Sequence, residues 1–210
     1  MKSFDCIIVG SGINSLVCAA ILARQGRKVC ILERNDRLGG CIRTEQVTVP
    51  GFRHDVLSAV HPLFVTSPGY AELGDALHDS GLEYTNNDSP TGVLLPDGRS
   101  LILTTSREDN MNTFESLATG DGEAYQRSMA LIDDNAGLIF GLLGGELWGL
   151  ATAKLLLSEV WRKNLHATAS FFGEAMQTCR SWLEDSFQSD LLRALLAPWI
   201  LHTGLGTESS

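Results

Sequence analysis

The sequence contains no run of Lys and Arg residues, no Cys-x-x-Cys pair and no histidines at the spacing of metal ligands. The formal net charge is −9, so a nucleic-acid backbone would repel the chain rather than bind it. The 5 cysteines are scattered and odd in number, which argues against a disulfide framework and favours a reducing compartment. We therefore predict neither a nucleic-acid partner nor a metal site.

Long uninterrupted apolar runs are also scarce. The best candidate, residues 136–157, contains Glu146, Lys154 and a Gly144-Gly145 break. An acid near the centre of a span is costly, so buried or substrate-lining helices are favoured and peripheral membrane contact is the less favoured alternative. Because a core strand is expected from about Phe4, the usual place of a signal peptide is taken, and we expect a cytoplasmic protein.

The strongest pattern that is present lies between residues 5 and 33. Residues 6–9 are a short apolar run typical of a buried parallel strand. Gly10 then lets the chain turn sharply, and Gly12 leaves room for a pyrophosphate against the start of the next helix. The free N–H groups and the dipole of a helix start attract such an anion.

An almost wholly apolar helix is expected over residues 13–25, ended by Gly26, with a second strand over residues 28–32. That strand delivers Glu33 to its carboxyl end, where a carboxylate can accept hydrogen bonds from a ribose. The third glycine of the Gly-x-Gly-x-x-Gly pattern is replaced by Ser15. A dinucleotide-binding βαβ unit is predicted by this order of strand, glycines, helix, strand and acid within about 30 residues.

A polar turn follows Glu33, where a nicotinamide-binding domain would normally continue into another crossover helix. The turn begins with Arg34 and ends in an Arg-x-Gly-Gly element at residues 37–40. With these motifs the chain resembles the FAD-dependent oxidoreductases of the phytoene desaturase and carotenoid isomerase type, relatives of the amine oxidases. It is most similar to their desaturase-like subgroup of pyridine nucleotide-disulfide oxidoreductase domain-containing proteins. Many amine-oxidase relatives carry Arg directly after the glycine pair, where this chain has Cys41 and then Arg43.

The resemblance implies FAD as cofactor and a small apolar substrate, such as a polyene or isoprenoid. It also implies that a missing C-terminal half completes the sheet. It indicates no catalytic residue. Pattern and resemblance together give these cofactor-binding candidates: Gly10, Ser11, Gly12, Ile13, Asn14, Ser15, Glu33, Arg34, Arg37, Gly39, Gly40 and Arg43.

The rest of the chain predicts a β-hairpin over residues 91–104 and then mostly helices, with a short strand at residues 82–85. Helix starts are predicted at Ser67-Pro68 and at Ser106, where a serine hydroxyl can cap the first turn. Bulky residues such as Trp161 and Phe187 are expected in the core. The predicted fold class is α/β: a Rossmann-like FAD-binding βαβ unit with an incomplete sheet, then a small β-hairpin region and a mostly helical substrate or cap domain. The expected domains are residues 1–66, 67–105 and 106–210.

Two other functions fit the same pattern. A non-catalytic dinucleotide-binding protein would keep the fold and bind a nucleotide without reducing it. An NAD-dependent dehydrogenase would bind NADH through Glu33 with no flavin present.

Overall fold

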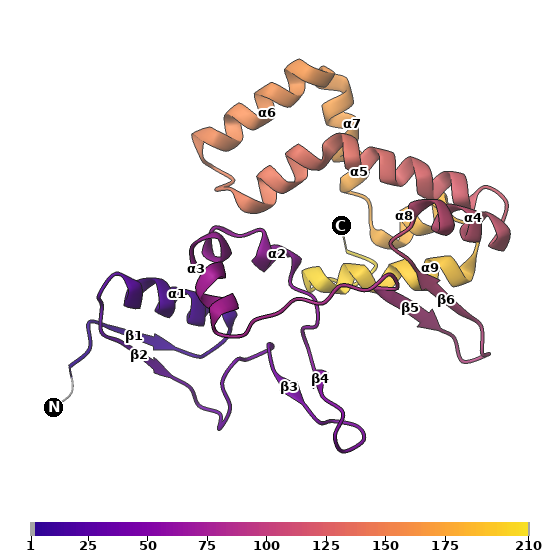
Figure 1. Cartoon of the computed structure of the whole chain (residues 1–210). Coiled ribbons are helices and arrows are strands. Elements are labelled where there is room, and N and C mark those ends of the chain that lie inside the picture. The colour runs from indigo at the N-terminus through magenta and orange to yellow at the C-terminus, as the bar shows by residue number, and fades with distance from the viewer. Residues whose placement is uncertain (1–2, 210) are drawn as a thin grey trace. The chain divides into compact units, whose positions relative to one another are not determined.

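The structure is a computed structural model, which describes the backbone of residues 3–209 and every side chain in that range except those at positions 202 and 203. This part of the chain forms two compact units that divide between Tyr84 and Thr85 (Figure 1). The first contains the glycine-rich turn, and the second contains the hairpin and most of the helices. The domain boundaries expected at residues 66 and 105 stay predictions.

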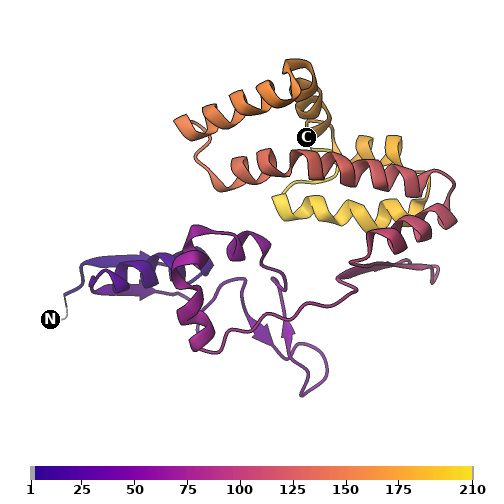
Figure 2. The same ribbon diagram turned by 45° about the horizontal axis from the view of Figure 1, so that its top comes forward.

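The first unit is built on a strand–helix–strand motif (Figures 1 and 2). Strand β1 (Cys6–Val9) pairs in parallel with β2 (Val29–Leu32), residue 6 lying opposite residue 29. Helix α1 (Ile13–Arg24) connects the strands and packs on them. A parallel pair needs such a crossover, and the predicted βαβ unit is confirmed.

Shorter elements complete the first unit. Helix α3 (Pro68–Asp79) packs against α1, and it begins where the sequence predicts: the hydroxyl of Ser67 accepts a hydrogen bond from the backbone N–H of Tyr70 at 3.1 Å. The other elements are an antiparallel strand pair and a single helical turn: β3 (Thr44–Glu45), β4 (His54–Asp55) and α2 (Pro62–Val65).

One face of the β1–β2 pair is exposed. Ile7 and Val9 of β1 have 63% and 82% of their surface accessible, and Leu32 of β2 has 51%. Parallel sheets are normally covered on both faces, so apolar strand residues at this exposure mark an unfinished sheet. Within residues 3–209 the parallel sheet has two strands, which agrees with the predicted incomplete sheet.

The second unit begins with the predicted hairpin. Strands β5 (Thr91–Leu94) and β6 (Ser100–Leu103) pair antiparallel. The short strand expected at residues 82–85 is wrong, because that segment has no strand partner in the structure. Helix α4 (Arg107–Leu117) starts at its predicted cap, where the Ser106 hydroxyl accepts from the N–H of Asp109 at 3.2 Å.

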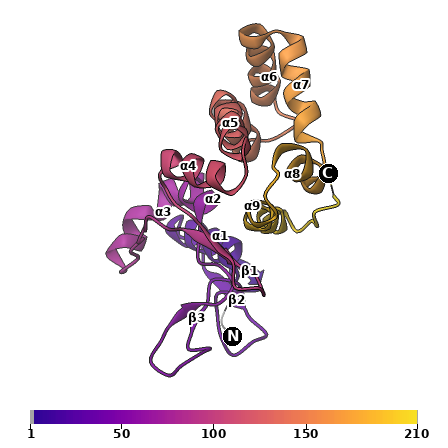
Figure 3. The ribbon, with the colours of Figure 1, turned by 90° about the vertical axis from the view of Figure 1, so that its right-hand side faces the viewer.

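Helices make up the remainder of the second unit (Figure 3). The glycine pair at 144–145 separates α5 from α6, as predicted. Helices α6 and α7 pack side by side. No described helix is long and apolar enough to cross a membrane. The helices after α4 are α5 (Asp121–Gly144), α6 (Leu150–Lys163), α7 (Leu165–Ala175), α8 (Cys179–Ser186), α9 (Asp190–Leu196) and the 3-10 helix η1 (Ala197–Thr203).

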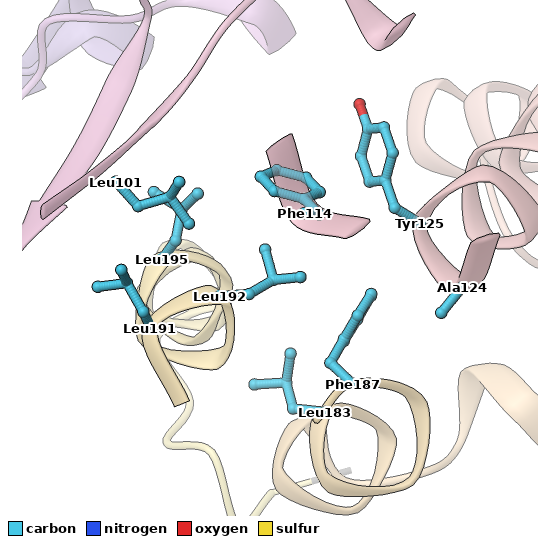
Figure 4. Packing of buried hydrophobic residues seen from close by; sticks show 9 residues of the cluster. All are labelled: Leu101, Phe114, Ala124, Tyr125, Leu183, Phe187, Leu191, Leu192 and Leu195. Atoms are coloured by element: carbon cyan, nitrogen blue, oxygen red, sulfur yellow. The ribbon is translucent and has the colours of Figure 1, made fainter. Parts of the chain in front are cut away.

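The core of the second unit joins the hairpin to four helices (Figure 4). Phe187 is fully buried there, as expected. The sequence predicts Trp161 in the core as well, but 94% of it is exposed, because its side of α6 faces solvent. The buried cluster consists of Leu101, Phe114, Ala124, Tyr125, Leu183, Phe187, Leu191, Leu192 and Leu195.

A buried carboxylate ties the start of α5 to the start of α9. Asp121 is 0% exposed. Its two carboxylate oxygens accept the backbone N–H groups of Gln188 at 2.7 Å and Ser189 at 2.9 Å. Hydrogen bonds to a charged acceptor are stronger than neutral ones, so this residue fixes the segment that precedes α9.

We expect Asp121→Ala to lower the free energy of unfolding of the second unit by about 2–4 kcal/mol, because two N–H groups lose their charged acceptor. Denaturant unfolding followed by circular dichroism measures the change. The matched control is Asp185→Ala at an exposed position of α8, expected within about 0.5 kcal/mol of wild type. Equal stability of the two variants would contradict this role for Asp121.

Candidate functional site: a glycine-rich turn beside an ionised carboxylate

The turn after β1 depends on a backbone conformation that favours glycine. Gly10 has a φ of +92°, which other residues adopt only with strain. Its N–H donates to the carbonyl of Leu32 at 2.7 Å, so the turn leaves the strand while still bonded to β2. The carboxyl ends of both strands and the start of α1 therefore lie together.

Gly12 is a glycine for a different reason. It is the N-cap of α1, with φ −66° and ψ 168°, a conformation that any residue can adopt. A Cβ atom built on it meets no described atom within 4 Å, and no side chain caps the helix. Nothing described in the chain requires glycine here, whereas a ligand lying against this backbone would. An uncapped helix start with open space above it suits an anion such as a pyrophosphate.

Ser11 lies between these glycines and is 1% exposed. Its backbone N–H and its hydroxyl both donate to Oε2 of Glu33, at 2.9 Å and 2.7 Å. The N–H of Gly39 in turn donates to the Ser11 hydroxyl oxygen at 3.2 Å and to the Ser11 carbonyl at 3.1 Å. The side chain thus joins three segments and is directed toward Glu33. Its role as a pyrophosphate ligand stays a prediction.

The second oxygen of Glu33 is held by a residue that the sequence did not single out. Oε1 accepts the backbone N–H of Asn35 at 3.0 Å and its side-chain amide at 2.9 Å. The Asn35 backbone N–H and then the Ser11 hydroxyl are the main causes that lower the pKa of Glu33 from 4.5 to about 2. The carboxylate is therefore ionised at neutral pH, at the carboxyl end of β2 and beside the glycine-rich turn.

The glycine pair of the Arg-x-Gly-Gly element packs on the same turn. Gly40 has a φ of +57°, and a Cβ atom on it would lie 3.2 Å from the Cα of Gly12. Two backbone segments therefore approach each other where a side chain would hold them apart. This close approach gives a reason in the chain itself for a glycine at position 40.

Two of the three predicted arginines pair with a carboxylate, and the third is exposed. Arg37 and Arg43 both reach Oε1 of Glu45, at 3.0 Å and 3.4 Å, and Arg34 is exposed. The Nε atom of Arg43 is buried and lacks a hydrogen-bond acceptor among the described residues, so it retains a donor for an anion. Glu45, like Asn35, was missed by sequence reasoning.

The structure brings most of the other candidates together. Gly10, Gly12 and Gly40 meet at the turn, with Glu33 beside them. At the start of α1, Ile13 and Ser15 are half-buried and Asn14 is exposed. Within the described residues no group of three or more His, Cys, Asp or Glu side chains could hold a metal ion. The arrangement places an uncapped helix start beside an ionised carboxylate, and adenine-dinucleotide sites combine these two features.

Because the folded pKa of Glu33 lies below 4.5, its ionised carboxylate stabilises the folded chain above about pH 4.5, and this contribution is lost as the pH falls toward about 2. Carbon-13 NMR of the side-chain carboxyl should therefore show Glu33 still ionised at a pH midway between these values. Ser11→Ala should move the titration midpoint upward by removing the hydroxyl donor. A wild-type midpoint near 4.5 would rule out this hydrogen-bonded arrangement.

Comparisons with known proteins agree with this geometry. Residues 8–73 match the family described as NAD(P)-binding Rossmann-like domain. A component of limonene dehydrogenase from Castellaniella defragrans is 29% identical over 126 residues, 60% of this chain and 22% of that protein. Pyridine nucleotide-disulfide oxidoreductase domain-containing protein 2 of Rattus norvegicus is 28% identical over 214 residues, 92% of this chain and 36% of that protein. Carotenoid 3,4-desaturase of Haloarcula japonica is 29% identical over 131 residues, 60% of this chain and 25% of that protein.

A solved structure of a putrescine oxidase triple mutant is similar in fold, with a TM-score of 0.50 at 18% identity, covering 94% of this chain and 37% of that one. The chain thus spans between 22% and 36% of the length of the curated relatives above. The matched Rossmann-like region contains the glycine-rich turn, Glu33 and the glycine pair. The chain is therefore related to the FAD-dependent oxidoreductases of the phytoene desaturase and carotenoid isomerase type, and residues 8–73 are its dinucleotide-binding Rossmann-like region.

Proposed function

We propose that this chain is part of an FAD-dependent oxidoreductase of the desaturase or isomerase type that acts on an apolar substrate of the polyene or isoprenoid class. The observation that carries the proposal is Gly12, which has open space where a Cβ atom would be and no partner in the chain that requires glycine. The pyrophosphate of FAD lies at this point, against the uncapped start of α1.

The surrounding residues have separate tasks. Glu33 accepts hydrogen bonds from the adenosine ribose, and its negative charge disfavours a 2′-phosphate there. The unpartnered Nε donor of Arg43 suits the phosphate or the flavin. When bound, FAD supplies the ring that accepts a hydride or electrons, so the chain's own residues bind, orient and exclude water.

The substrate class is supported by two observations. The relatives include enzymes named for limonene and for carotenoids, both apolar isoprenoids. The second unit also contains a groove of about 430 Å³ between its helices, with a mostly apolar lining. Such a groove suits a hydrocarbon chain better than a charged substrate. Its apolar lining includes Leu131, Ile132, Phe171, Trp182 and Leu196.

Completion of the sheet belongs to the same proposal. Ile7 and Val9 leave an apolar strand face exposed, and a parallel sheet is stable when both faces are covered. We propose that a more C-terminal part of the protein, within the length that the relatives have beyond this chain, supplies the covering strands.

The five cysteines are free, which supports a reducing, cytoplasmic location.

We expect Gly12→Ala to weaken FAD binding at least tenfold, because the new methyl group fills the space of the pyrophosphate, while folding stability falls by at most about 1 kcal/mol. FAD titration followed by flavin absorbance and fluorescence measures the affinity. The control is Gly137→Ala in α5, where a Cβ atom also meets nothing within 4 Å. Equal FAD affinity in the wild type and both variants would contradict the site.

The same titration separates the alternatives. Bound FAD that no donor reduces in the whole protein would indicate a non-catalytic dinucleotide-binding protein. Binding of NADH that Glu33→Ala weakens, with no affinity for FAD, would indicate a nicotinamide dehydrogenase.

The groove is tested with a fluorescent polyene, parinaric acid. We expect Ile132→Glu to weaken its binding several-fold, because a carboxylate at the groove is costly beside a hydrocarbon chain. Ile132 is 45% exposed, so the variant should fold. The control is Ile102→Glu on β6, at 56% exposure and outside the groove. Unchanged affinity in Ile132→Glu would remove the groove as the substrate site.

A further inference from the structure

The carboxylate of Glu33 has no acceptor position left for a ligand. A carboxylate offers about four lone-pair sites on its two oxygens. Oε2 accepts two donors of Ser11, and Oε1 accepts two donors of Asn35. A ribose that is to bind Glu33 must therefore displace one of these four donors.

Three of the four donors are fixed by the fold. Two are the backbone N–H groups of Ser11 and Asn35, which move only with the main chain. The third is the buried Ser11 hydroxyl, whose oxygen is also held by the N–H of Gly39. The fourth is the side-chain amide of Asn35, an exposed residue, and rotation about its own side-chain bonds is enough to release it.

We propose that the Asn35 side-chain amide is an internal competitor for the ribose, occupying Oε1 of Glu33 until a ribose hydroxyl displaces it. This inference rests on the proposed function, since it concerns the sugar of the same dinucleotide. The amide holds the 33–35 turn in the free chain, and each binding event breaks this hydrogen bond. Asn35 is thus a positioning residue that lowers the affinity for ligands with a ribose diol.

The effect does not depend on the charge of Glu33. The pKa of this carboxyl is held low chiefly by the backbone N–H of Asn35 and the hydroxyl of Ser11. Both donors remain when the Asn35 side chain is shortened. Removing the amide therefore opens an acceptor position on a carboxylate that stays ionised.

The test compares two small ligands, ADP and 2′,3′-dideoxy-ADP, by isothermal titration calorimetry at neutral pH. Asn35→Ala should bind ADP about two- to tenfold more tightly than wild type, the effect of one net hydrogen bond no longer broken. The affinity for dideoxy-ADP should not change, because that ligand brings no hydroxyl to Glu33. Asn112→Ala, at an exposed asparagine of α4, is the matched control and should leave both affinities unchanged.

Two other results would overturn the inference, and a third would remove the dinucleotide site itself. Weaker or unchanged ADP binding in Asn35→Ala, with wild type binding normally, overturns this inference and leaves the proposed function standing. Equal tightening for both ligands also overturns it, because the gain would then be independent of the ribose. If neither ADP nor FAD binds the wild-type chain, the dinucleotide site itself fails, and this inference fails with it.

Discussion

The hydrogen bonds from Ser11 to Glu33 are the interaction on which the site depends. They connect the turn after β1 to the end of β2, and the N–H of Gly39 extends the connection to the glycine pair. The turn is 22 residues from Glu33 and 28 from Gly39 in the sequence, yet the proposed ligand site needs all three segments at one edge of the sheet. The Ser11 side chain is buried, and its hydroxyl donates to Glu33. It therefore holds the carboxylate in position and does not cap the start of α1.

The glycines of this region differ in whether the fold itself explains them. Gly10 is explained by its positive φ, and Gly40 by its contact with the backbone of Gly12. Gly12 has neither reason, and a bound pyrophosphate is the reason that we propose for it. The exposed apolar face at Val9 is a similar case, because parallel sheets are usually covered on both faces.

Much of this architecture could be predicted because it depends on local patterns. Apolar runs and glycine spacing located β1, α1 and β2, and hydroxyl caps located the starts of α3 and α4. Asn35 and Glu45 were missed because their contacts depend on side-chain directions that no period in the sequence encodes. The strand expected at residues 82–85 failed because a short apolar segment becomes a strand only when it has a pairing partner. Trp161 shows the same limit for burial, since composition does not tell which side of a helix is covered.

The proposed site depends on a pyrophosphate bound at the first turn of α1. Nitrogen-15 NMR of the labelled chain, with FAD added stepwise, tests this most directly by following each backbone amide. We predict that the largest shifts fall on residues 10–15, followed by the segment 33–40, and that the amides of the second unit barely move. Largest shifts among the helices of the second unit, with the amides of residues 10–15 unchanged, would contradict the account.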